Sequence, residues 1–108
     1  MTLKSSDHGK TVEVPLGESI TIRLPENPTT GYRWAVDSIT QSHLTSDEGH
    51  FVPATGSGVG GGGYREMVVH TKQEGVGEVR LKLGQPWEDE SAVSHRFEVR
   101  VVVRSNSR

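Results

Sequence analysis

The sequence predicts an all-β protein of about seven short strands. Apolar residues recur at every second position in several segments, and the 3.6-residue period of an amphipathic helix is nearly absent. Glycine, proline and asparagine separate these segments at the spacing expected of strand connections. This pattern predicts an immunoglobulin-like sandwich of two sheets, with a small barrel as the alternative.

Four segments show the alternation most clearly. Residues 18–24 place three large aliphatic side chains on one face and polar ones on the other, and residues 78–83 do the same. In residues 32–37 the indole of Trp34 is expected in the core, because so large an apolar surface is best buried at the centre of a domain. Residues 97–104 form the longest alternating run and are expected to make the closing strand.

The remaining elements are less regular. Residues 12–14 predict a short first strand, residues 64–70 a strand, and Phe51 and Val52 a short strand that ends at Pro53. Residues 38–49 are polar and are expected to be a long connection. Residues 75–77 are expected to form a tight turn, because two of the three are glycine.

The length and composition bound the class of protein. A chain of 108 residues is expected to form one domain, residues 1–108, with fraying at residues 1–8 and 105–108. The net charge of −2 argues against a nucleic-acid partner. The first residues contain no apolar run, so no signal peptide or membrane span is expected. The protein would be periplasmic or secreted if a leader was removed, and otherwise cytoplasmic.

The residues that carry catalysis in other proteins do not form a recognisable site here. The chain has no cysteine, which excludes a disulfide, a thiolate metal site and a cysteine nucleophile. Five histidines occur, but none pairs at metal-ligand spacing. Residues 58–63 are glycine-rich but lead into a strand, whereas a phosphate-binding loop opens a helix. We therefore expect no metal, no cofactor and no enzymatic activity.

Three connections have unusual compositions. The threonine loop, residues 27–32, reads Asn27-Pro28-Thr29-Thr30-Gly31-Tyr32. The glycine loop covers residues 56–63, and the tryptophan loop covers residues 84–94 and contains Gln85, Pro86 and Trp87. If successive strands run up and down, all three loops lie at the same end of the sandwich.

The threonine loop is expected to be rigid. Pro28 fixes its own φ and keeps Asn27 out of the helical region, the two threonines restrict χ1, and Gly31 permits a chain reversal. Rigid loops lose little entropy on binding, although the same residues also suit an ordinary hairpin connection. Trp87 lies outside any alternating pattern, so it is either an exposed binding residue or a lid over the end of the sandwich.

Together these three motifs resemble the chagasin family of inhibitors of papain-like cysteine proteases. The family carries an NPTTG-aromatic loop, a GxGG loop and an RPW loop in this order at one end of an immunoglobulin-like sandwich. Here the first motif matches fully, and the third has Gln85 where the family commonly has arginine. The second has two registers, residues 58–61 or residues 60–63, and the latter agrees better with a strand that begins at Tyr64.

The resemblance implies a reversible inhibitor that is a monomer when free. Its partners would be papain-like cysteine proteases of the papain and cathepsin L type. The implied binding residues are Asn27, Pro28, Thr29, Thr30, Gly31 and Tyr32; Gly60, Gly61, Gly62, Gly63 and Tyr64; and Gln85, Pro86 and Trp87. Thr29, Thr30 and Gly31 would cover the catalytic cysteine, the glycine loop would extend along the unprimed side, and Trp87 would pack on the primed side.

Two other functions fit the same fold. A carbohydrate- or peptide-binding immunoglobulin-like module would use an exposed Trp87 as a stacking platform. A structural adhesion domain would need none of the three loops. Titration of papain with the protein separates these hypotheses, because only an inhibitor abolishes its activity near stoichiometry.

Overall fold

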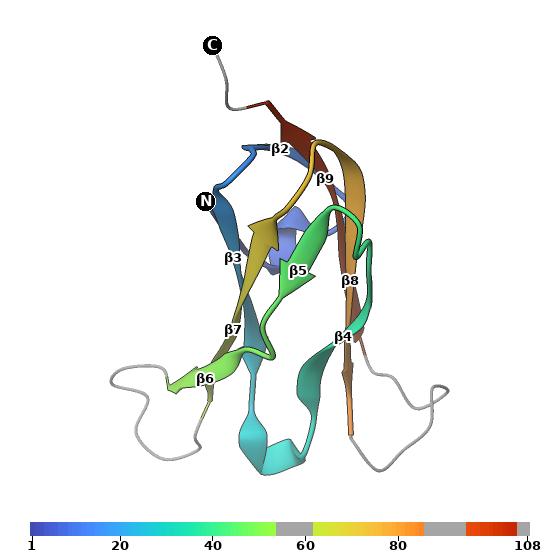
Figure 1. The fold of residues 1–108 in the computed structure, drawn as a ribbon. Coiled ribbons are helices and arrows are strands. Elements are labelled where there is room, and N and C mark those ends of the chain that lie inside the picture. The colour runs from blue at the N-terminus through green and yellow to red at the C-terminus, as the bar shows by residue number, and fades with distance from the viewer. Residues whose placement is uncertain (54–61, 86–94, 106–108) are drawn as a thin grey trace.

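The computed structural model describes residues 1–53, 62–85 and 95–105 and consists of two β-sheets packed face to face (Figure 1). The first sheet contains β1 (Thr2–Leu3), β3 (Ser19–Glu26), β7 (Gly63–Thr71) and β5 (Leu44–Ser46) in this order, with β6 (His50–Pro53) also paired to β7. The second contains β2 (Thr11–Pro15), β9 (His95–Arg104), β8 (Gly75–Gly84) and β4 (Arg33–Ile39). The predicted all-β sandwich is confirmed.

The helical content of the described residues is two single 3-10 turns, η1 (Ser5–Asp7) and η2 (Pro28–Thr30). Across the same residues no helix is long and apolar enough to cross a membrane.

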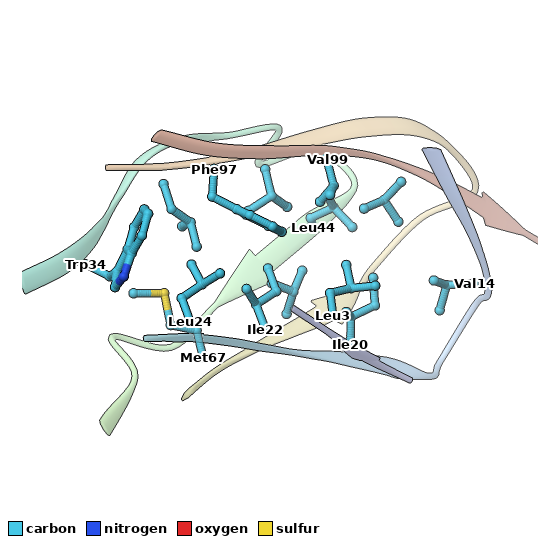
Figure 2. Packing of buried hydrophobic residues seen from close by; sticks show 14 of the residues in the cluster. Leu3, Val14, Ile20, Ile22, Leu24, Trp34, Leu44, Met67, Phe97 and Val99 are labelled. Carbon is cyan, nitrogen blue, oxygen red and sulfur yellow. The ribbon is translucent and has the colours of Figure 1, made fainter. Parts of the chain in front are cut away.

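The alternating residues fill the space between the sheets, as the sequence predicts. Figure 2 shows the core with Trp34 at one end and Val14 at the other. The buried hydrophobic residues are Leu3, Val14, Ile20, Ile22, Leu24, Trp34, Leu44, Met67, Val69, Val79, Leu81, Phe97, Val99, Val101 and Val103. Their burial removes apolar surface from water, which is the main driving force for this fold.

The first eight residues have regular structure, contrary to the expected fraying. β1 pairs in parallel with β3, and Leu3 is only 4% exposed. The Asp7 carboxylate accepts a hydrogen bond from the Lys4 backbone N–H at 2.8 Å, which lowers the pKa of Asp7 and holds the η1 turn that follows β1. The burial of Leu3 in the core holds this segment in place. The strand has only two residues, so the sequence shows no alternation of apolar and polar residues there.

Residues 38–49 were expected to be a long connection without strands. This is wrong in two places, because the segment contains the end of β4 and all of β5. β4 continues to Ile39 beyond a β-bulge between Val36 and Ser38, and Leu44–Ser46 form β5. Leu44 is fully buried. A three-residue strand with one inward side chain gives no alternation to recognise.

The tight turn expected at residues 75–77 is also absent, because these residues are the first part of β8. Gly75 lies opposite Val103 and Gly77 opposite Val101 in the antiparallel pair with β9. Two different constraints favour glycine here: a Cβ on Gly77 would lie 2.8 Å from Cδ1 of the buried Leu44, and Gly75 has φ 133°, a conformation that other residues rarely adopt. Gly77 thus reflects close packing within a strand, and Gly75 reflects the backbone conformation at the start of β8.

Candidate functional site

The threonine loop is a 3-10 turn closed by its own side chains. The Asn27 Oδ1 accepts hydrogen bonds from the Thr29 backbone N–H at 3.0 Å and from the Thr29 hydroxyl at 2.7 Å. The Thr30 hydroxyl donates to the Asn27 carbonyl at 2.8 Å. Asparagine and threonine thus use their short polar side chains to fix the backbone. The rigidity predicted from the sequence therefore has a hydrogen-bonded basis.

The loop passes from one sheet to the other. It leaves the first sheet at the end of β3 and enters the second at the start of β4, and these strands are not paired. Gly31 has φ 80°, a left-handed conformation that favours glycine, and it turns the chain toward Arg33. The alternative of an ordinary hairpin is therefore excluded.

Strand pairing brings the ends of all three loops to one pole. At the edge of the first sheet, Gly63 lies opposite both Glu26 and Pro53. In the second sheet, Arg33 lies opposite Gly84 and Leu83 opposite His95. Figure 1 shows the end of β3, the start of β4 and the ends of β6 and β8 at the lower pole. The strands that flank the three loops thus end on the same side of the sandwich.

A hydrogen bond also joins the threonine loop to the start of the tryptophan loop. The Gln85 side-chain Nε2 donates to the Thr30 carbonyl at 3.2 Å. An arginine at position 85 would present a charged donor, whereas glutamine makes this contact with a neutral amide. Gln85 therefore supplies a hydrogen-bond donor to the threonine loop, although it is not an arginine.

The glycine loop enters β7 through a crowded backbone. A Cβ on Gly63 would lie 2.3 Å from the Val52 carbonyl oxygen and 2.7 Å from Cζ of Phe51. Next along the strand, the Arg23 guanidinium carbon lies 4.3 Å from the centre of the Tyr64 ring, a cation–π geometry. Gly63 is required for the pairing of β6 with β7, and Arg23 holds the Tyr64 ring on the outer face.

A buried ion pair that the sequence did not predict lies beneath the threonine loop. The Glu26 side chain is 2% exposed and pairs with Arg65, whose Nη2 lies 2.7 Å from its Oε1. The other carboxylate oxygen, Oε2, accepts hydrogen bonds from the Arg65 Nε at 3.1 Å and the Trp34 backbone N–H at 2.8 Å. The period of two gives the inward orientation of Glu26, which continues the face of Ile22 and Leu24, but it does not give the partner.

A groove of about 340 Å³ lies between the threonine loop and the start of β7. Its lining comes from the ends of β3, β7 and β8 and from the threonine loop: Pro25, Glu26, Asn27, Thr30, Tyr32, Gly62, Gly63 and Leu83. This groove separates the threonine loop from the start of β7, so the side of the loop that faces β7 is open.

Four of the predicted binding residues, Gly60, Gly61, Pro86 and Trp87, lie outside the described residues. The others are placed: the threonine loop, Gly62 to Tyr64 and Gln85 are at the same pole. In the described part of the chain, no group of three histidine or acidic side chains is arranged to hold a metal ion.

Comparison with known proteins identifies the class of protein to which this chain belongs. The model of the chagasin family of peptidase inhibitors matches residues 13–101. Chagasin of Trypanosoma cruzi is 33% identical over 96 residues, which cover 85% of this chain and 87% of chagasin. The chain belongs to the chagasin family. It is therefore an inhibitor of cysteine proteases and not an enzyme, and this outcome favours the inhibitor over the carbohydrate- or peptide-binding module.

Solved structures share the fold. The cysteine protease inhibitor EhICP2 of Entamoeba histolytica superimposes with a TM-score of 0.83 at 23% identity, covering 95% of this chain and 94% of that one. PbICP-C, solved in complex with falcipain-2, gives a TM-score of 0.73 at 17% identity and covers 95% of this chain and 98% of that one. At these identities the likeness bears on the fold.

Proposed function

We propose that this chain blocks papain-like cysteine proteases by inserting the threonine, glycine and tryptophan loops together into the active-site cleft. The observation that carries the proposal is the convergence of the strand ends that flank all three loops, with Gln85 bonded to the carbonyl of Thr30. That PbICP-C, a protein of the same fold, forms a complex with falcipain-2 supports a protease as the partner.

The threonine loop is suited to fill the active site without being cleaved. A cysteine protease attacks a carbonyl that reaches its thiolate in a near-attack geometry. In the threonine loop the Asn27 carbonyl accepts from the Thr30 backbone N–H and hydroxyl, and the Thr30 carbonyl accepts from Gln85. These bonds hold the carbonyls in a compact turn, whereas a substrate presents an extended strand. Thr29, Thr30 and Gly31 then cover the catalytic cysteine without being cleaved.

The other two loops extend the contact on either side. In the glycine loop, Gly60 to Gly63 have no Cβ, which allows the close approach needed for main-chain hydrogen bonds to an enzyme, as in strand addition. Trp87 supplies a large apolar surface for the primed side. An interface of this kind buries about 800 Å² per partner, the usual size for protease–inhibitor pairs.

Titration of papain tests the proposal. A fixed concentration of papain is mixed with increasing amounts of the purified chain, and hydrolysis of a fluorogenic peptide is measured. We expect activity to fall to near zero close to a 1:1 ratio and to recover on dilution, with trypsin unaffected in parallel. Undiminished papain activity at a large excess of the chain would reject the proposal.

A further inference from the structure

We infer that Glu26, with Arg65 and Trp34, is a positioning residue that fixes the threonine loop for inhibition. The role in inhibition rests on the proposed function, in which the threonine loop enters the active-site cleft of the protease. Glu26 is the last residue of β3 and the only charged residue that is buried among those the structure describes. It directly precedes Asn27, so any movement of its backbone moves the loop.

The contacts of Glu26 join three strands. Its carboxylate receives two hydrogen bonds from Arg65 on β7 and one from the backbone N–H of Trp34 on β4. β7 belongs to the first sheet and β4 is the edge strand of the second. The backbone N–H of Trp34, on this edge strand, has its hydrogen-bonding need met by the Glu26 carboxylate. Glu26 therefore bridges the two sheets where the loop crosses between them.

A second bond closes the same loop. The Trp34 indole Nε1 donates to the Pro25 carbonyl at 2.8 Å. Trp34 thus contacts both residues that precede the threonine loop, one through its backbone and one through its side chain. The two chain ends of residues 27–33 are held together by these bonds, and the loop is closed at its base.

Stability alone does not explain such a pair. A buried ion pair is often no more stabilising than apolar residues of the same volume, because each charge loses its hydration. An ion pair has directional hydrogen bonds, however, and apolar side chains of that size would not fix the position of Trp34. The arrangement therefore suits a role in the geometry of the loop, which lowers the entropy lost when the loop binds.

The test compares three variants with the wild-type chain. Glu26→Gln keeps the shape but replaces an acceptor oxygen by an NH₂ group that faces other donors. The double variant Glu26→Met with Arg65→Met removes both charges at similar volume. Val101→Ala, at a fully buried position of β9, lowers stability without touching the loop. For each we would measure the thermal midpoint, the inhibition constant for papain and amide hydrogen exchange at residues 29–34.

We expect Glu26→Gln to weaken papain inhibition about tenfold or more and to accelerate exchange at Thr30 and Trp34 by a similar factor. The double variant should unfold at a temperature at or above that of Glu26→Gln and should inhibit no better. Val101→Ala should lower the midpoint and leave the inhibition constant unchanged.

The inference would be overturned if the double variant had the inhibition constant and the loop exchange rates of the wild-type chain. It would also be overturned if Glu26→Gln changed neither quantity. A loss of inhibition in Val101→Ala as large as in Glu26→Gln would assign the effect to stability instead. If the wild-type chain does not inhibit papain, the proposed function fails, while the exchange rates still decide whether Glu26 fixes the loop.

Discussion

At the scale of single residues, small and polar side chains at the pole serve to shape the backbone. Asn27 and Thr30 close the threonine loop through four hydrogen bonds in which their side-chain oxygens take part. Gly63 gives the Val52 carbonyl room to approach. The functional loops therefore depend on what these residues do to the local conformation as well as on what they present to a partner.

Replacement of Gly63 by alanine should destabilise the protein by about 1–3 kcal/mol, the usual cost of forcing extra volume into a packed site. Its new Cβ would lie 2.3 Å from a backbone oxygen that cannot move without disturbing β6. Urea denaturation measures the free energy of unfolding. Gly62→Ala is the matched control, because a Cβ there meets no atom within 4 Å. Equal stability of the two variants would contradict the crowding.

Replacement of Thr30 by valine should weaken papain inhibition about three- to tenfold, which corresponds to one net hydrogen bond. Valine keeps the shape but loses the hydroxyl that donates to the Asn27 carbonyl at 2.8 Å and accepts from the Tyr32 N–H at 3.3 Å. The measurement is the inhibition constant. Thr45→Val, on the exposed face of β5, is the control and should leave inhibition unchanged. Equal inhibition by both variants would show that the hydroxyl has no role.

At the scale of elements, the long strands were predictable from the sequence and the two shortest strands, β1 and β5, were not. β3, β8 and β9 carry several inward residues each, so their period is clear in the sequence. β1 has two residues and β5 has three, and each contributes one buried leucine. Such strands exist because a neighbouring strand offers them hydrogen bonds and a place in the core.

Truncation of Leu3 tests whether β1 is part of the fold. Leu3→Ala should lower the free energy of unfolding by about 2–3 kcal/mol, toward the lower end for buried leucines because β1 lies at a sheet edge. Thermal or urea unfolding provides the measurement. Met1→Ala is the control and should be nearly neutral, since that side chain is 60% exposed. A neutral Leu3→Ala would restore the expectation of a frayed end.

At the scale of the whole molecule, the site is a property of how two sheets are stacked. Its described parts come from residues 27–32, 62–64 and 85, which are far apart in the sequence. The sandwich holds them at one pole because the strands that flank them share hydrogen-bonded partners. A rigid scaffold with loops at one end suits tight binding, since little order has to be acquired on association.

Removal of the Trp87 indole tests whether the tryptophan loop takes part in the same contact. Trp87→Ala should raise the inhibition constant for papain by about 30-fold, the equivalent of about 2 kcal/mol for an interface hot spot. The thermal midpoint should stay the same, because the indole is expected to face the enzyme. Unchanged inhibition together with a lower midpoint would instead identify the indole as a lid on the sandwich.

The sequence by itself determined the all-β class, the inward faces of the long strands and the three loops that set this chain apart. These features are local: a period of two and a proline–threonine–glycine turn can be recognised from neighbouring residues. The tertiary structure decided that β1 and β5 form, and that Glu26 meets Arg65 and Trp34. Those contacts join residues 8 to 39 positions apart, and their partners become known only once the sheets are stacked.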